Sequence, residues 1–312
     1  MRDDFLWVSK YRPSRIADTI LPTDLKQTFQ EFVNQGQIPN LLLCGGAGVG
    51  KTTVAKAMLD ELGCTYLVIN GSMNGNIDTL RTEIKDFAST VSLEGGRKYV
   101  ILDEADYLNP QSTQPALRNF MEEFSKNCGF ILTCNFKNRI IEPLHSRCSV
   151  VDFTIPKSEI SSMAADFYKR CKEILNIENI EFDNKVLAEV VKKYFPDNRR
   201  VLNELQRYGA SGKIDVGILS DIGDVSISEL IDTLKAKKFT EMRHWVASNI
   251  HNDVNTVFRK IYDNASEYLE SQSIPQLVTI VADYQYKSAF VADQEINLVA
   301  CLTEIMVECD FK

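Results

Sequence analysis

Five short runs of mostly apolar residues recur between residues 37 and 153, and each is long enough for one strand. The runs are Asn40–Cys44, Tyr66–Asn70, Tyr99–Asp103, Phe130–Asn135 and Val150–Phe153. Nearly unbroken apolar runs are typical of strands covered on both faces, as in a parallel sheet flanked by helices. Between two of the runs, apolar residues recur every three or four positions from Ile77 to Val91, which indicates an amphipathic helix. This part of the chain predicts an α/β domain.

The strand pattern ends after Phe153, and helical patterns take its place. Apolar stripes at helical spacing run through residues 157–222, and another runs from Val254 to Leu269. Gly223-Asp224 separates the two helical regions. The pattern predicts three units: an α/β domain over residues 1–153, a small helical domain over residues 154–225 and an all-helical domain over residues 226–312.

Composition and charge narrow the class of protein. The 312 residues are 44% hydrophobic and 25% charged, as in an ordinary folded domain. Lys and Arg number 35 against 43 Asp and Glu, a net charge of −8, which argues against a protein that coats DNA through overall positive charge. A local basic surface stays compatible with this charge. Most of the acidic excess lies in residues 226–312, so we expect nucleic acid to bind the first two units.

Targeting signals and cysteine spacing favour the cytoplasm. No run approaches the ~18 apolar residues that a membrane span needs, and no apolar signal-peptide segment follows Met1. None of the eight cysteines forms a C-x-x-C pair, and the three histidines are scattered. We therefore expect reduced thiols rather than disulfides or a zinc site, and no membrane partner.

Residues 45–52 match the phosphate-binding loop pattern G-x-x-x-x-G-K-[ST], between a predicted strand and a predicted helix. In such a loop, backbone N–H groups surround the phosphates, and the helix N-terminus adds its positive dipole end. We expect Lys51 to reach the β- and γ-phosphates of ATP and the Thr52 hydroxyl to bind Mg²⁺. The candidate ATP-binding residues of this segment are Gly45, Gly46, Ala47, Gly48, Val49, Gly50, Lys51, Thr52 and Thr53.

The third apolar run ends in two acids, Asp103 and Glu104. Downstream of a phosphate-binding loop, the first acid typically holds Mg²⁺ and the second activates the water that attacks the γ-phosphate. The letters from Asp103 to Asp106 also spell the name of an RNA-helicase class. That class needs a second α/β motor domain, whereas the rest of this chain has helical patterns.

Four further segments complete a recognisable set of motifs. They are Trp7–Pro13 (Trp-Val-Ser-Lys-Tyr-Arg-Pro), Leu132–Asn135, Ser146-Arg147-Cys148 and Phe195–Gln206. With the phosphate-binding loop, they resemble the AAA+ clamp-loader ATPases, which include the replication factor C small subunits and the large subunits of T-even phage clamp loaders. The resemblance covers nearly all of the first two predicted units. It implies an AAA+ domain, a helical lid and, in residues 226–312, a helical collar, in a host bacterium's cytoplasm if the chain is phage-encoded.

The resemblance also implies roles for individual residues. The contacts to the base and ribose of ATP would come from Val8, Tyr11, Arg12 and Pro13. Asn135 would orient the attacking water, and Arg147 would be an arginine finger that enters the ATP site of a neighbouring subunit. Arg199 would sense the γ-phosphate from the lid, with Arg200 as the alternative if the alignment is shifted by one residue.

In the same family, helix N-termini contact DNA and one helix end contacts the clamp. The segment Asn70–Arg81 resembles the DNA-facing motif, although Gly75-Asn76 replaces its basic residue. The implied DNA-binding residues are Asn76, Arg81, Lys85, Ser112 and Thr113. The implied clamp-binding residues are Val91 and Leu93, and for Val91 simple packing at the helix end is an equal alternative.

The function implied is a DNA-stimulated ATPase that opens a ring-shaped sliding clamp and loads it at primer–template DNA. Its partners would be the clamp, the DNA, copies of itself and a smaller subunit in a pentamer. One alternative is a structural subunit that binds ATP without hydrolysing it, which predicts damage at Glu104, Asn135 or Arg147, and all three are intact. Another is a helicase loader or branch-migration motor, but the last block has the pattern of a collar rather than of a winged helix.

Overall fold

The structure is a computed structural model that describes residues 5–73, 77–90, 97–210, 212–215, 227–249 and 254–312. The chain forms two compact units, Met1–Ile222 and Gly223–Lys312. Within the described stretches, no helix is long and apolar enough to cross a membrane. The predicted boundary near residue 154 falls inside the first unit and stays a prediction.

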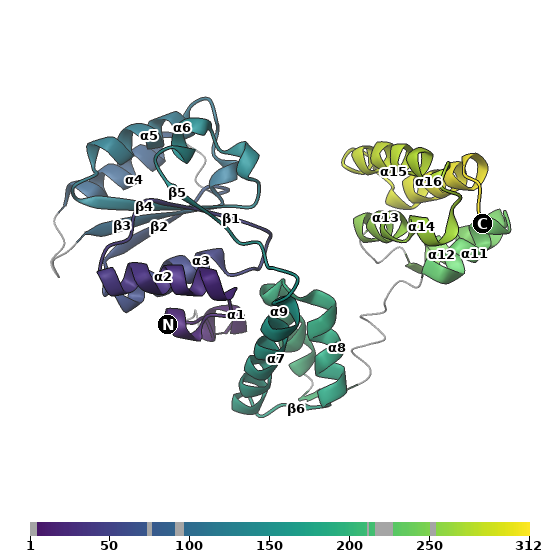
Figure 1. Ribbon diagram of the computed structural model, residues 1–312, viewed down its shortest axis with the longest axis horizontal. Helices are drawn as coiled ribbons and strands as arrows, with labels where there is room; N and C mark the ends of the chain where they lie inside the picture. Colours follow the sequence, from purple (N-terminus) through teal and green to yellow (C-terminus); the bar gives the residue numbers. More distant parts are fainter. Residues whose placement is uncertain (1–4, 74–76, 91–96, 211, 216–226, 250–253) are drawn as a thin grey trace. The chain divides into compact units, whose positions relative to one another are not determined.

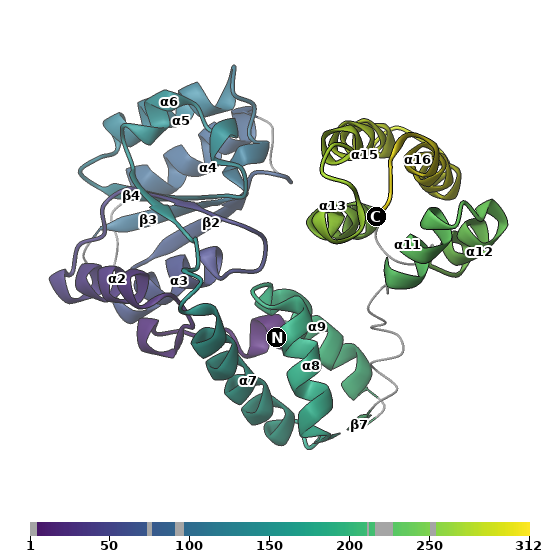
Figure 2. The same ribbon diagram turned by 45° about the vertical axis from the view of Figure 1, so that its right-hand side comes forward.

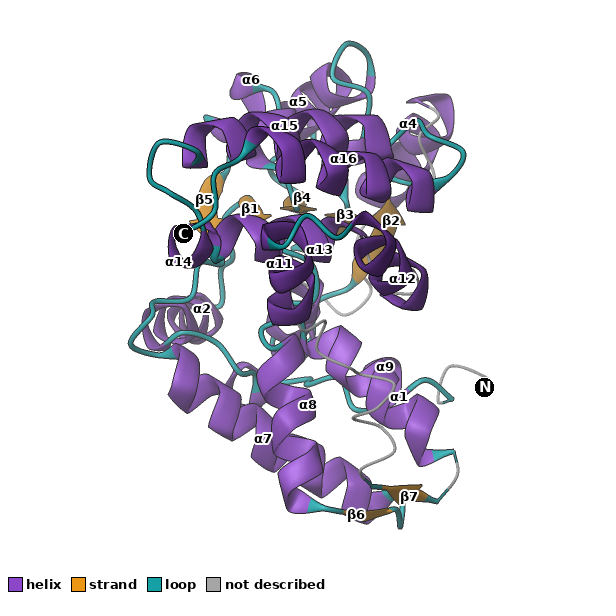
Figure 3. Cartoon of the chain, turned by 90° about the vertical axis from the view of Figure 1, so that its right-hand side faces the viewer, coloured by secondary structure: helices purple, strands orange, loops and turns teal. Residues whose placement is uncertain are grey.

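The first unit contains a five-stranded parallel sheet with the order β2-β3-β4-β1-β5 (Figure 1, Figure 3). Its strands are β1 (Leu41–Cys44), β2 (Tyr66–Asn70), β3 (Lys98–Asp103), β4 (Cys128–Cys134) and β5 (Ser149–Asp152). Its helices up to β5 are α1 (Trp7–Lys10), η1 (Ile16–Asp18), α2 (Thr23–Gln35), α3 (Lys51–Glu61), α4 (Ile77–Ser89), η2 (Ala105–Tyr107), α5 (Thr113–Glu123), η3 (Lys137–Arg139) and α6 (Glu142–His145). The strands agree with the predicted runs to within two residues, which confirms the predicted α/β fold.

Helices cover both faces of this sheet, which explains why the strands are apolar throughout. Leu41 and Leu43 of β1 pack in the cluster that contains α2 and α3, whereas Leu42 and Cys44 pack in the cluster that contains α4 and α5. Figure 1 shows α2 and α3 on one side of the sheet and α4, α5 and α6 on the other. The two hydrophobic clusters, one on each face of the sheet, therefore fix the positions of the strands and of their carboxyl ends.

Three helices follow the sheet in the first unit: α7 (Ile160–Ile177), α8 (Asn184–Tyr194) and α9 (Asn198–Gly209). They have a core of their own, and Trp7 of α1 is buried in it with Phe167 and Leu205. The sequence predicted helices here and missed the two-residue strands β6 (Glu181–Phe182) and β7 (Lys213–Ile214), which pair in parallel. Strands this short leave no alternating pattern in the sequence.

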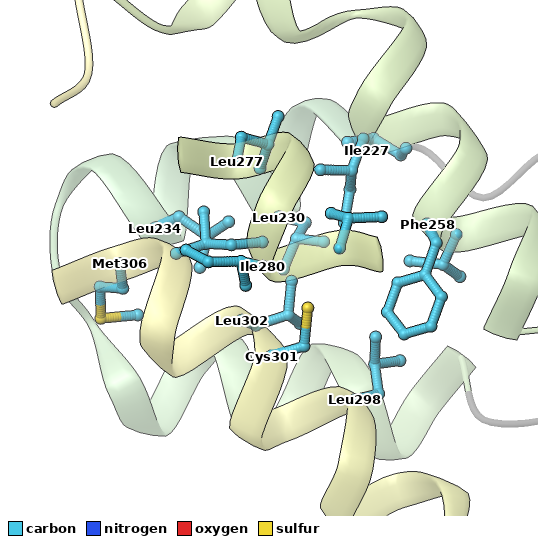
Figure 4. Close-up of a cluster of buried hydrophobic side chains, with 14 of the residues drawn as sticks. Ile227, Leu230, Leu234, Phe258, Leu277, Ile280, Leu298, Cys301, Leu302 and Met306 are labelled. Carbon is cyan, nitrogen blue, oxygen red and sulfur yellow. The ribbon is translucent and has the colours of Figure 1, made fainter. Parts of the chain in front are cut away.

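The second unit is helical, with one isolated bridge between Leu269 and Phe311 in its described part. Its helices are α11 (Ile227–Lys235), α12 (Phe239–Asn249), α13 (Val254–Asp263), α14 (Ala265–Tyr268), α15 (Ile274–Ser288) and α16 (Gln294–Glu308). The apolar stripe from Val254 to Leu269 is divided between α13 and α14, with a break at Asn264. Figure 2 shows α15 beside α16, and Figure 4 shows Leu230, Cys301 and Leu302 in the buried cluster that these helices share with α11.

Candidate nucleotide-binding site

The predicted phosphate-binding loop connects β1 to α3. Gly48 and Gly50 adopt positive φ angles of 72° and 98°, which side chains disfavour, and Gly50 directly precedes α3. A Cβ atom on Gly48 would lie 1.8 Å from Oδ1 of Asp197, at the start of α9. The loop therefore adopts a conformation that needs glycine, and the α9 end packs directly on it.

Lys51 lies at the centre of the site. Its Nζ atom donates hydrogen bonds to the carbonyl oxygens of Gly45 (2.8 Å) and Gly46 (2.6 Å) and to Oδ1 of Asn135 (2.9 Å). The residue is buried, and this desolvation lowers the pKa of the Lys51 ammonium group, while Asp103 and Asp106 oppose that shift. The loop and the residue that follows β4 thus meet at one buried cation, and the sensor role of Asn135 stays a prediction.

Asp103, the last residue of β3, gathers two hydroxyl groups. Its Oδ1 atom accepts hydrogen bonds from Oγ1 of Thr52 and from Oγ1 of Thr133, each 2.6 Å away. A threonine hydroxyl beside a carboxylate is a suitable donor set for Mg²⁺, which takes its other ligands from phosphates and water. In the described part of the chain, no group of three or more His, Cys, Asp or Glu side chains could hold a metal by itself.

Glu104 is in the left-handed region, with φ of 57°. Its N–H group donates to Oγ1 of Thr133 at 3.1 Å, so this backbone is tied to β4. Two residues later, the buried Asp106 accepts hydrogen bonds through Oδ2 from the N–H groups of Asn135 and Phe136, both at 3.2 Å. Hydrogen bonds to Thr133 of β4 and to the two residues that follow β4 therefore hold the turn that carries Glu104 in place.

A pocket lies over these groups. The predicted residues that line it are Val8, Tyr11, Arg12, Pro13, Gly48, Gly50, Lys51, Thr52, Thr53, Asp103 and Arg199. Arg12 has a buried Nε atom without a partner among the described residues, and burial with nearby Arg12 lowers the pKa of Lys56, another lining residue. A buried guanidinium N–H group without an acceptor fits an anionic or hydroxyl-rich ligand such as a nucleotide.

The arginine alternatives differ in position. Arg199 lines the pocket and is close enough to Lys51 to lower its pKa further. The guanidinium group of Arg200 instead lies 4.6 Å from the ring centroid of Tyr194. The geometry therefore favours Arg199 as the residue that faces the nucleotide.

Other predicted residues lie outside the lining. They are Gly45, Gly46, Ala47, Val49, Glu104 and Asn135, of which Gly45, Gly46 and Asn135 contact Lys51. Arg147 also lies outside it: Nε and Nη2 donate to Oε1 of Glu122, and Nη1 donates to the carbonyl of Pro143 at 2.9 Å. This guanidinium group lowers the pKa of Glu122. Arg147 is thus held on its own chain's surface and away from its own pocket.

Sequence reasoning missed several residues of the site. Those that line the pocket are Asp18, Thr19, Ile20, Leu21, Val54, Lys56, Val68, Phe167, Arg170, Ile174, Asn198 and Leu202. Phe167, Arg170 and Ile174 share the spacing of one face of α7, which could have indicated them once α7 was placed over the loop. Thr133 was missed as well, although it precedes Asn135 by only two residues at the end of β4.

The predicted DNA- and clamp-binding residues divide into three groups. Arg81 and Lys85 on α4 are exposed, as is Ser112 before α5. Thr113 has a buried side chain, and its N–H group donates to the carbonyl of Asn109, so its role as a DNA contact stays a prediction. Asn76, Val91 and Leu93 lie outside the described residues.

Comparison with known proteins places the chain in a family. A model described as the sliding-clamp-loader large subunit AAA+ ATPase lid domain matches residues 159–220, and the model of the ATPase family associated with various cellular activities matches residues 41–155. The sliding-clamp-loader large subunit of Escherichia phage RB69 is 36% identical over 311 residues, 97% of this chain and 96% of the relative. The replication factor C small subunit of Thermofilum pendens is 30% identical over 319 residues, 96% of each.

A solved structure titled Thermotoga maritima RuvB Holliday junction branch migration motor matches with a TM-score of 0.52 and 15% identity, covering 72% of this chain and 78% of that one. At this identity the likeness concerns the fold alone. The match to the phage and archaeal sequences over nearly the whole chain agrees with the pocket, which Lys51 of the loop, Asp103 of β3 and Arg199 of α9 line together. The chain belongs to the sliding-clamp-loader family of AAA+ ATPases.

Proposed function

We propose that this clamp-loader ATPase binds ATP to open a ring-shaped sliding clamp and hydrolyses it to release the clamp on primer–template DNA. The observation that carries the proposal is the pocket that joins Lys51 and Thr52 of the loop, Asp103 of β3 and Arg199 of α9. A nucleotide in it would contact the sheet and α9 together. Binding of a nucleotide would thereby change how α9 packs on the sheet.

The chemistry follows from the groups present. Lys51 and the loop N–H groups bind the phosphates, and Arg12 with Tyr11 holds the ribose and base. Mg²⁺ held by Thr52 and Asp103 would neutralise phosphate charge. Glu104 accepts a proton from the attacking water, and Asn135, already bonded to Lys51, orients that water.

Arg147 would complete the site of a neighbouring copy. On its own chain it is paired with Glu122 and turned away from the pocket, which agrees with a residue that acts in trans. Copies of this chain and a smaller subunit, joined through residues 226–312 in a pentamer, would bring each Arg147 to the next ATP. DNA would contact Arg81, Lys85 and Ser112, and the clamp would contact Val91 and Leu93.

Two other functions are less well supported. A subunit that only binds nucleotide would not need Glu104, Asn135 and Arg147, which are all present. A branch-migration motor shares the fold of the RuvB structure, but at 15% identity this likeness says nothing about activity.

The test is turnover by the assembled complex, with and without primed DNA and the cognate clamp. Glu104→Gln should retain ATP binding and lower the DNA-stimulated rate by about 10²–10⁴-fold, because the amide cannot accept the proton. Glu189→Gln, at an exposed position of α8, makes the same chemical change outside the site and should keep the wild-type rate. Wild-type turnover by Glu104→Gln would show that Glu104 takes no part in the reaction. A wild-type rate that does not rise when primed DNA and clamp are added would contradict the clamp-loading proposal.

A further inference from the structure

The backbone pairing of β3 with β4 ends at Leu102 and Leu132. The next residue of β4, Thr133, continues the connection with its side chain. Its Oγ1 atom donates to Oδ1 of Asp103 at 2.6 Å and accepts from the N–H group of Glu104 at 3.1 Å. The hydroxyl group of Thr133 therefore links β4 to both Asp103 and Glu104.

Burial makes this hydroxyl group hard to replace. Thr133 is 1% exposed, and every residue of β4 is buried. The core around β4 would otherwise favour an apolar side chain. Valine, with the same shape, would leave the Glu104 N–H group without its acceptor and would leave Oδ1 of Asp103 with the Thr52 hydroxyl group alone.

The two bonds also have a fixed direction. Asp103 accepts, so the hydroxyl proton points to its carboxylate, and the oxygen lone pair is left for the Glu104 N–H group. Glu104 needs such support because its backbone has a positive φ, which residues other than glycine seldom adopt. On the other side, a Cβ atom on Gly71 would lie 2.6 Å from the Glu104 carbonyl oxygen, so that peptide is closely packed too.

We propose that Thr133 is a positioning residue for the reaction: its hydroxyl group sets the carboxylate of Asp103 for the metal and the backbone of Glu104 for the attacking water. The inference rests on the proposed roles of Asp103 and Glu104. Because Thr133 lies two residues before Asn135, which follows the end of β4, it also ties the position of the proposed γ-phosphate sensor to that of the acid pair. Thr133 itself lies outside the pocket lining and contacts the nucleotide only through these partners.

The test compares Thr133→Val, which removes the hydroxyl group and keeps the shape, with Thr133→Ser, which keeps the hydroxyl group. In the assembled complex with primed DNA and clamp, the valine variant should lose about 10–100-fold in kcat, as is typical for residues that orient a metal ligand. KM for ATP should rise only as far as the Mg²⁺-dependent part of nucleotide affinity is lost, and the serine variant should recover most of the rate. Thr233→Val, at a buried hydroxyl group of α11 in the second unit, is the matched control and should keep the wild-type rate.

A second readout does not depend on turnover. ADP affinity of the purified chain, measured with a fluorescent ADP analogue with and without Mg²⁺, reports the orientation of Asp103. The valine variant should lose most of the increase in affinity that Mg²⁺ gives, and the serine variant should retain it. Should the valine variant fail to fold, Thr133→Cys takes its place, because a thiol is a weak donor and should fall below serine in kcat.

The outcomes separate the two proposals. Wild-type kcat and Mg²⁺ dependence in Thr133→Val, with an inactive Glu104→Gln, would overturn the positioning role and leave the proposed function intact. An active Glu104→Gln would count against the proposed base itself. A valine variant that loses activity without rescue by serine would make Thr133 a packing residue only.

Discussion

Gly48 is a position where a single added methyl group should affect both the loop and the lid-side helix. Gly48→Ala would force a side chain into a positive φ and place its Cβ atom 1.8 Å from Asp197. We expect nucleotide affinity to fall tenfold or more, which corresponds to about 1.4 kcal/mol, because α9 can no longer pack on the loop. Titration with a fluorescent ATP analogue measures this loss.

Gly36 provides the control for backbone strain alone. It has nearly the same φ, 69°, but an added Cβ atom meets nothing within 4 Å. Gly36→Ala should therefore cost about 1 kcal/mol in the free energy of unfolding and leave nucleotide affinity unchanged. Equal nucleotide affinity in the two alanine variants would contradict the role given to the contact between Gly48 and Asp197.

At the scale of residues, the sequence predicted those site residues that belong to a short local motif. Lys51, Thr52 and Asp103 were predicted from spacing alone, and the structure brings them into one pocket. Contacts that depend on tertiary packing were not predictable, such as Asp197 on Gly48. The burial of Thr113 was not predictable for the same reason, since a motif at a helix start does not show which side chains the core buries.

At the scale of elements, α1 belongs to the core of α7, α8 and α9. The Trp7 ring is buried there, and the backbone N–H group of Trp7 donates to Oε1 of Gln206 on α9 at 3.0 Å. Tyr11, just after α1, donates to Glu178 at the end of α7. The segment that lines the nucleotide pocket is therefore anchored on these helices, so loss of that anchor should disturb binding.

Trp7→Ala tests this anchor. Removing a buried indole typically costs about 3–5 kcal/mol in the free energy of unfolding, and here Val8 and Arg12 would lose their support as well. We expect lower stability of the first unit together with lower ATP affinity, measured by circular dichroism melting and nucleotide titration. Trp245→Ala makes the same deletion in the core of the second unit and should lower that unit's stability only. Unchanged ATP affinity in a folded Trp7→Ala protein would separate α1 from the site.

The elements themselves were largely predictable. Strands covered on both faces leave long apolar runs, and the five of the sheet were found to within two residues. The helix predicted from Ile77 to Val91 is α4, Ile77–Ser89. Short features escaped, namely β6, β7 and the break at Asn264, because two or three residues carry too little periodicity to be recognised.

At the scale of the whole molecule, the chain holds a nucleotide pocket in the first unit and a separate apolar core in the second. Arg147 belongs to the first unit and is bonded to Glu122 and Pro143 of its own chain. An exposed ion pair of this kind is weak, so a neighbour's γ-phosphate could displace Glu122 at little cost. The chain alone is thus expected to bind ATP without the charge that speeds its hydrolysis.

If one subunit supplies the loop and its neighbour supplies Arg147, two variants that are each inactive should restore an active site when they assemble together. Lys51→Ala lacks the phosphate-binding cation but keeps Arg147, whereas Arg147→Ala keeps an intact loop. Each variant alone should be inactive, since an arginine finger contributes about 10³–10⁵ in rate. In a mixture that assembles, an Arg147 from the first variant can serve the loop of the second, so part of the DNA-stimulated ATPase activity should return. A mixture of Lys51→Ala with a double Lys51→Ala, Arg147→Ala variant contains no intact loop and should stay inactive. Activity of the first mixture no higher than that of this control, with assembly verified by light scattering, would show that Arg147 serves its own subunit.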